Sequence, residues 1–89
     1  MRINTNKKTS LNDNRQNVIE LQIFLRVMSR ENPSVPLINP DGVFGSLTGT
    51  AVKLSQGIFD FIPTGRVDYE TWTELYRRYS NFILKNGRL

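Results

Sequence analysis

Apolar residues recur at helical spacing in the first third of the chain. They fall at i, i+3, i+7 and i+10, with one aromatic residue on the same side: Val18, Leu21, Leu25, Met28 and Phe24. This spacing predicts an amphipathic helix whose apolar stripe faces a core. We expect the helix to begin near residues 12–14, where an Asn or Asp side chain can accept bonds from the free first-turn amides. It should stop by Asn32, because Pro33 disfavours helical geometry in the residue before it.

A second apolar line runs along another face of the same helix and comprises Ile19, Ile23 and Val27. A helix that is apolar on two faces is either sandwiched between other elements or carries a contact surface. In the first interpretation these residues lie under the N-terminal arm or the next loop. In the second they form a possible protein interface.

The segment PSVPLINP, residues 33–40, places three prolines among apolar residues. It is too rich in proline for a central strand. We expect an extended connector that lies on the core through Val35, Leu37 and Ile38.

A short second helix is expected after Gly45, with Ser46 as its N-cap, and it should reach about Phe59. Turn residues follow at 63–65. Gly49 lies in the first turns of this helix and weakens it by up to about 1 kcal/mol relative to alanine.

The third helix carries the clearest periodic pattern. Asp68 should cap it, Glu70 suits its first turn, and Gly87 should end it. Its apolar stripe comprises Trp72, Leu75, Tyr76, Tyr79, Phe82 and Ile83, and its polar face comprises Thr73, Glu74, Arg77, Arg78 and Asn81. The prediction is an all-α three-helix bundle over residues 14–85, with a flexible arm at 1–13 and a tail at 86–89. No internal repeat is apparent.

Composition narrows the chemistry. The 89 residues form one domain and contain neither cysteine nor histidine, so no thiolate metal site and no histidine base are available. We expect no metal and no cofactor. The net charge of +4 suits anionic partners or simply solubility. The apolar runs are too short for a membrane span, and the N-terminus lacks a signal-peptide segment.

The glycine-rich stretch DGVFG, residues 41–45, raises the possibility of a phosphate loop. A phosphate loop requires a terminal Gly-Lys-Ser/Thr or a preceding strand, and neither is present. Asp41 and Gly42 instead suit a tight turn in which the glycine takes a positive φ. Phe44 can then point into the core, and Gly45 lets the chain turn into the second helix.

Several separated blocks occur in order over about residues 15–80, and together they resemble the peptidoglycan-binding domain found beside many cell-wall hydrolases. The blocks are Val18-x-x-Leu21-Gln22-x-x-Leu25, Asp41-Gly42-Val43-Phe44-Gly45-x-x-Thr48-x-x-Ala51-Val52, Gln56, and Thr64-Gly65-x-Val67-Asp68-x-x-Thr71-Trp72-x-x-Leu75. The resemblance implies a three-helix module whose core includes Val18, Leu21, Leu25, Phe44, Ala51, Val52, Trp72, Leu75 and Tyr79. The long connector at 29–40 also resembles a variant common in spore-forming Gram-positive bacteria.

Two departures from the family pattern affect the second helix and the turn after it. Ser55 stands where the family usually has Phe before the glutamine, which would forfeit several kcal/mol if nothing refilled the space (about 3–5 kcal/mol for Phe to Ala). The family register turns Thr48, Val52 and Phe59 inward and leaves Leu54 and Ile58 partly exposed, whereas a rolled helix would bury Leu54. We favour the family register. Asp60 replaces a glycine, and aspartate tolerates left-handed geometry better than most residues.

The resemblance implies a non-catalytic module that binds peptidoglycan or muropeptides and targets a larger protein or a partner enzyme to the bacterial cell wall or envelope. Family contacts are usually placed near the loop into the second helix, which makes the candidate ligand-binding residues Asp41, Gly42, Phe44, Gly45, Ser46 and Thr48. Gln22 and Gln56 either contact ligand or hydrogen-bond the connectors. Trp72 should be a core residue rather than a sugar platform. Any catalytic domain should lie outside these residues, and with no signal peptide the chain should be an excised domain or an intracellular, spore or phage component.

Two other classes of function compete with this interpretation, and the first of them stays open. A protein-interaction module of an envelope, spore or phage-tail assembly would use an apolar patch made of Ile19, Ile23, Val27, Leu54 and Ile58. A helix-turn-helix nucleic-acid binder is not expected, because the helices are joined by long connectors and the arginines are scattered.

Overall fold

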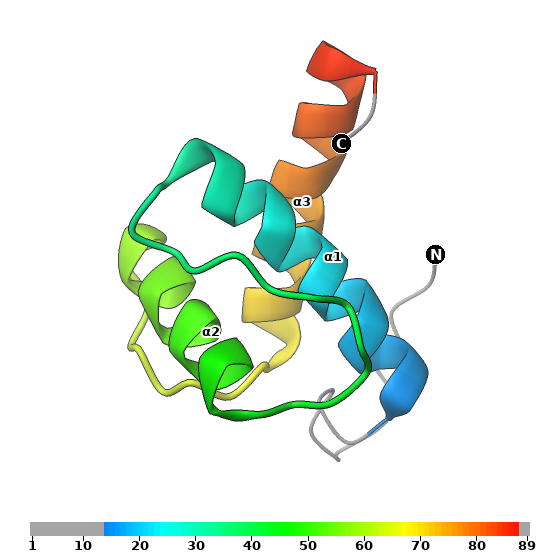
Figure 1. Ribbon diagram of the computed structural model, residues 1–89. Helices are drawn as coiled ribbons and strands as arrows, with labels where there is room; N and C mark the ends of the chain where they lie inside the picture. Colours follow the sequence, from blue (N-terminus) through cyan, green and yellow to red (C-terminus); the bar gives the residue numbers. More distant parts are fainter. Residues whose placement is uncertain (1–13, 88–89) are drawn as a thin grey trace.

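A computed structural model describes residues 14–87, in which three helices are joined by two ordered connectors (Figure 1). The helices are α1 (Arg15–Glu31), α2 (Ser46–Ile58) and α3 (Tyr69–Asn86). These residues include no strand, which confirms the all-α three-helix prediction. No helix in this part of the chain is both long and apolar enough to cross a bilayer. The predicted N-terminal arm, residues 1–13, lies outside the described residues.

The helix ends follow the capping signals, with one correction. The Asn14 side chain accepts a hydrogen bond from the Asn17 amide at 3.1 Å, and the Asp68 side chain accepts one from the Thr71 amide at 2.9 Å. Ser46 was predicted as the N-cap of α2 but is its first helical residue. Gly45 takes the extended N-cap conformation and supplies no side-chain bond.

The C-terminal end of α3 is where the sequence predicted it, because Asn86 is the last helical residue and Gly87 ends the helix. Gly87 caps the helix with a φ of 86° and donates its backbone N–H to Ile83. Residues 88 and 89 lie outside the described range.

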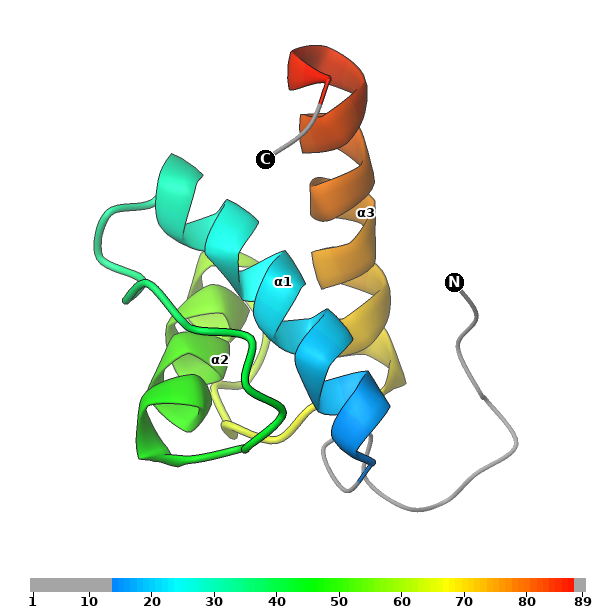
Figure 2. The same cartoon turned by 45° about the vertical axis from the view of Figure 1, so that its right-hand side comes forward.

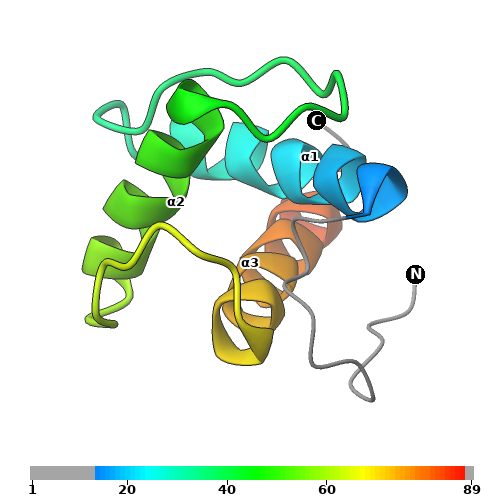
Figure 3. The same cartoon turned by 90° about the horizontal axis from the view of Figure 1, so that it is seen from below.

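Helix α1 is the central element, because it packs against both α2 and α3 and most extensively against α3 (Figure 3). Helix α1 contributes more residues to the core than any other element, and the two connectors, α2 and α3 supply the rest: Leu21, Phe24, Leu25, Met28, Val35, Ile38, Ala51, Val52, Val67, Trp72 and Leu75. Among the predicted core residues, Phe44 and Tyr79 are half-buried and pack against this cluster, and the other seven are buried.

The second apolar face of α1 is largely covered, which corrects part of the predicted interface. Val27 is fully buried, whereas Ile19 and Ile23 are half-buried. The reason is that α1 packs on two helices at once, so its apolar surface is sandwiched more than it is displayed. Val27 therefore cannot belong to a contact surface.

Phe24 joins α1 to α3 through aromatic contacts. Its ring lies edge-on to Trp72 with centroids 5.2 Å apart, and tilted against Tyr79 at 5.0 Å and Tyr76 at 5.8 Å. Such pairs add roughly 0.5–1.5 kcal/mol beyond the area that they bury. Trp72 is almost completely buried, so it is a core residue and not a sugar platform.

The connector after α1 lies on the core through Val35 and Ile38, both buried, and Arg26 Nη1 donates to the Ile38 carbonyl at 3.0 Å. Leu37 was also predicted to pack on the core, but this prediction is wrong, because its side chain is 61% exposed. Val35 and Ile38 are three residues apart, which matches the three residues per turn of an extended proline-rich chain, and Leu37, one of the two residues between them, faces outward.

Helix α2 adopts the family register. Thr48 and Val52 are buried, Phe59 is half-buried against the core, and Leu54 is 38% exposed. Ile58 is half-buried and also packs against the core. Ser55 is fully buried, and its hydroxyl has no hydrogen-bond partner within residues 14–87.

The C-terminal half of α3 extends beyond the other two helices (Figures 1 and 2). Burial on α3 is concentrated in its first turns, at Thr71, Trp72 and Leu75, whereas Leu84 is 84% exposed. The distal turns of α3 therefore lie mostly outside the core, and residues 77–85 lie near Glu31 at the C-terminal end of α1.

Candidate functional site

Gln22 of α1 holds the loop that leads into α2. Its Nε2 group lies within hydrogen-bond distance of Asp41 Oδ1 at 3.1 Å, of the Val43 carbonyl at 3.0 Å and of Thr48 Oγ1 at 3.2 Å. Its Oε1 atom accepts from the Gly42 amide at 2.9 Å. The Gln22 side chain is buried, so these contacts satisfy an amide that would otherwise be costly to bury.

Gln56 of α2 holds the loop that leads into α3 in the same way. Its Nε2 group contacts Thr64 Oγ1 at 3.3 Å, the Arg66 carbonyl at 2.9 Å and Thr71 Oγ1 at 3.0 Å. Its Oε1 atom accepts from the Gly65 amide at 2.9 Å. Gln56 is also buried.

The two loops form an internal structural repeat that the sequence analysis did not detect. In each, a glutamine from the preceding helix binds a turn whose glycine has a positive φ, 81° at Gly42 and 79° at Gly65. The glutamine then reaches a threonine in the next helix, Thr48 or Thr71. The repeat is hard to detect in the sequence, because residues 41–48 and 64–71 share only the glycine and the threonine, and Thr64 stands at the place of Asp41.

Most of the predicted ligand-binding residues are engaged inside the first loop. Asp41, Gly42 and Thr48 bind Gln22, and Phe44 is half-buried against the core. Gly45 and Ser46 are exposed, and so is Val43. The structure thus brings the predicted residues together. Asp41 stays exposed although it is bonded within the loop, and the rim at Val43, Gly45 and Ser46 is also open to solvent.

The hydrogen bonds within the loop lower the pKa of Asp41. The largest cause is the Val43 amide, which donates to Asp41 Oδ1 at 2.9 Å, and the next is the Gln22 side chain. Arg15 makes a smaller contribution, and its Nη1 donates to the Asp41 carbonyl at 2.9 Å. The ionised carboxylate is therefore part of the loop structure.

The three aspartates in the described part of the chain lie in three different segments. Asp41 lies in the first loop, Asp60 takes a left-handed φ of 64° in the turn after α2, and Asp68 caps α3. No cluster of three metal-ligating side chains occurs among the residues that the structure describes.

A groove of about 260 Å³ lies between the end of α1 and the distal turns of α3. It is lined by Glu31, Arg77, Arg78, Asn81, Phe82 and Lys85. The sequence analysis assigned Arg77, Arg78 and Asn81 only to the polar face of the third helix. A signal was available, because Arg78, Phe82 and Lys85 recur at the i, i+4 and i+7 spacing of one helical face.

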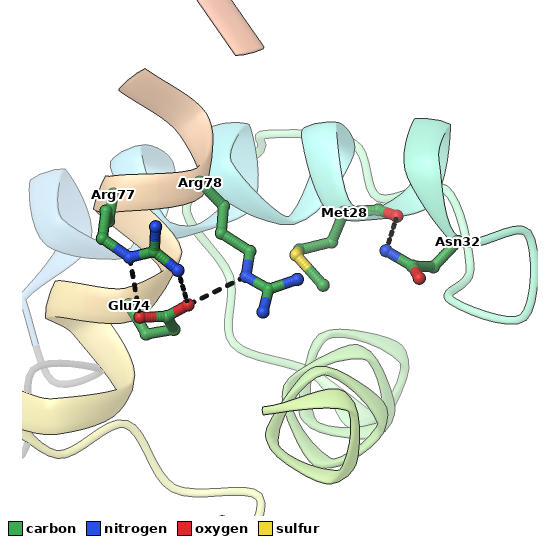
Figure 4. A network of polar contacts seen from close by, with 5 residues as sticks. All are labelled: Met28, Asn32, Glu74, Arg77 and Arg78. Atoms are coloured by element: carbon green, nitrogen blue, oxygen red, sulfur yellow. Dashed lines mark hydrogen bonds and ion pairs between the residues drawn. The ribbon is translucent and has the colours of Figure 1, made fainter. Parts of the chain in front are cut away.

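Glu74 orients both arginines of this groove (Figure 4). Arg77 Nε donates to Glu74 Oε1 at 3.0 Å, and Arg78 Nε donates to Glu74 Oε2 at 2.9 Å. The hydrogen bonds from Arg77 are the largest cause of a lowered pKa at Glu74. Partial burial acts in the opposite direction, and the bond from Arg78 lowers the pKa further. The Arg78 guanidinium also lies over the Phe59 ring, 4.7 Å from its centroid.

Residues 14–75 match the family described as the putative peptidoglycan binding domain. This span covers most of the chain, including both glutamine-held loops, and the chain therefore belongs to that family. Searches against curated proteins and against solved structures gave no match.

Proposed function

We propose that this chain is a non-catalytic module that binds bacterial peptidoglycan and brings a larger protein or a partner enzyme to the cell wall. The observation that carries the proposal is the family match over residues 14–75, which spans the two glutamine-held loops that define the fold here. Among the described residues, Asp41, Asp60 and Asp68 have structural places in a loop, a turn and a helix cap.

The rim of the first loop is one candidate contact region. Gly45 provides no side chain to cap α2, so the first amides of that helix are available to a ligand acceptor. Ser46 and Val43 are exposed beside them. A saccharide hydroxyl or a peptide carbonyl suits these donors.

Co-sedimentation with purified sacculi tests the function. We expect the protein to pellet with sacculi saturably and to be released by soluble muropeptides. Chitin is a control polymer, because its chain of N-acetylglucosamine is similar to the wall glycan but carries neither lactyl groups nor peptide branches. Equal recovery with chitin and with sacculi, or no recovery with either, would contradict the proposal.

The alternative role as a protein-interaction module has weaker support. One of the residues assigned to its interface, Val27, is buried, and Ile58 packs partly against the core. Leu54 remains exposed on α2. The other three residues, Ile19, Ile23 and Ile58, are half-buried, so Leu54 is the one exposed member of the predicted patch.

A further inference from the structure

The groove between α1 and α3 combines preorganised cations with one acidic wall. Arg77, Arg78 and Lys85 of α3 line it together with Glu31, which lies in the last turn of α1. The helix dipole gives that end of α1 a partial negative potential, which adds to the Glu31 charge. The groove is therefore cationic along α3 and anionic at α1.

Arg78 is the best-placed ligand group in the groove. Its Nε atom is bound by Glu74, and its guanidinium lies over the Phe59 ring. Within the described residues its two Nη groups make no hydrogen bond, and Figure 4 shows them directed away from Glu74. A guanidinium held in this way loses little side-chain entropy when it binds an anion, and its paired N–H groups match a carboxylate.

The remaining lining residues suit a short peptide. Asn81 offers an amide that can pair with a peptide group, and the half-buried Phe82 ring offers an apolar surface. The volume of about 260 Å³ is below the roughly 300–1,000 Å³ of sites for drug-sized ligands. It accommodates one or two terminal residues of a peptide, and not a saccharide repeat.

We propose that this groove binds the terminal carboxylate of a short peptide branch of the cell wall, with Arg78 as the anchor and Lys85 as a second cation. The inference rests on the proposed wall-binding function for the source of the peptide. A polyanion such as a wall phosphate polymer fits less well, because it would meet Glu31 on the facing wall. A peptide that carries both an amine and a carboxylate complements both walls.

An NMR titration of the whole chain tests the groove with four probes: a muropeptide with a free C-terminal carboxylate, the same peptide as its C-terminal amide, inorganic phosphate, and glycerol phosphate. We expect the free acid to shift amides at residue 31 and residues 77–85, and to bind about tenfold or more tightly than the amide. Equal binding of acid and amide, tighter binding of either phosphate probe, or shifts confined to other residues would overturn the inference.

Charge-neutralising variants locate the anchor. Arg78→Gln should weaken binding of the free acid about tenfold or more, and Lys85→Gln should weaken it less. Arg66→Gln is the matched control, because it removes the same charge from an exposed position in the connector before α3. Equal weakening in Arg78→Gln and Arg66→Gln would show that binding depends only on the net charge of the protein, which would contradict the proposal. Lys85→Gln keeps the test decisive if the loss of Arg78 from the Phe59 ring lowers stability.

The two proposals fail separately. Binding to sacculi without any peptide-induced shift in the groove would overturn the groove assignment and leave the wall-binding function intact. Binding of the free acid in the groove without retention on sacculi would overturn the wall-binding function and leave the carboxylate site standing.

Discussion

Asp41 lies at the surface of the molecule, yet its Oδ1 atom is occupied by the loop that contains it. The Val43 amide and the Gln22 side chain both donate to this atom, at 2.9 and 3.1 Å. In the unfolded chain neither donor is held there. The charge on Asp41 therefore stabilises the folded loop, although the side chain is accessible to solvent.

Replacing Asp41 by asparagine tests this role through pH. The folded-state pKa of Asp41 lies below the 3.8 of an ordinary aspartate. Its contribution is thus fully present above that value and is lost as the pH falls through the folded pKa. We expect Asp41→Asn to be less stable than the parent at pH 7, and the difference to shrink at pH values below 3.8. Urea unfolding at a series of pH values measures this, and a pH-independent difference would show that the charge is irrelevant.

At the scale of elements, the glycines of α2 and of its preceding loop have opposite roles. Gly42 has a φ of 81°, and an added Cβ would lie 2.5 Å from Arg15 Nη1. At Gly49, in the first turns of α2, an added Cβ would meet only Phe44 Cε1, at an ordinary 3.6 Å. The loop requires glycine at position 42, whereas the helix merely tolerates it at position 49.

The same substitution at both positions should therefore have effects of opposite sign. Gly49→Ala should stabilise the protein by up to about 1 kcal/mol, because alanine restricts the unfolded chain and suits a helix interior. Gly42→Ala should destabilise it by about 1–2 kcal/mol through left-handed strain, and it also crowds Arg15. Thermal unfolding should show midpoints displaced by several degrees in opposite directions. A loss of stability in Gly49→Ala would mean that Phe44 cannot accommodate the methyl group.

At the scale of the whole molecule, two equivalent loops connect three helices, and each is held by one buried glutamine. The loops differ in charge. The amide of Gln22 faces a carboxylate and a carbonyl, at Asp41 and Val43, and one hydroxyl, at Thr48. The amide of Gln56 faces two hydroxyls, at Thr64 and Thr71, and only one carbonyl, at Arg66.

Glutamate substitutions should separate the two loops. Gln22→Glu would bury an uncompensated carboxylate at a position that is almost completely buried, with one oxygen where Gln22 Nε2 now lies 3.1 Å from Asp41 Oδ1. Burial of this charge should cost roughly 3–5 kcal/mol at pH 7. In Gln56→Glu the Thr71 hydroxyl can rotate to donate, and the Thr64 hydroxyl can do so by giving up its bond to the Arg66 carbonyl, so the cost should be smaller, about 1–3 kcal/mol. Denaturant unfolding of both variants measures the difference, which should narrow at low pH as the new carboxyl groups protonate. Equal costs for the two variants would contradict the prediction that the first loop opposes a carboxylate at the glutamine position more strongly than the second loop does.

The extent and direction of each helix could be predicted from local sequence signals. The apolar period, Pro33 and the cap at Asp68 each act on residues only a few positions away along the chain, so they do not depend on the tertiary structure. The family blocks similarly predicted the inward register of α2, with Val52 buried and Leu54 partly exposed. The composition alone removed thiolate and histidine chemistry from consideration.

Contacts between distant residues could not be read from the chain. Periodicity showed that α1 is apolar on two faces but not that α3 and α2 cover both, and only packing buries Val27. The groove needs Glu31 of α1 beside Lys85 of α3, and no local pattern places them together. The sequence by itself thus determined the helices, the caps at Asn14, Asp68 and Gly87 and the turn chemistry, because these depend on neighbours along the chain. The tertiary structure alone decided which faces are covered, how the glutamines hold the loops and where the groove lies, because these depend on helix packing.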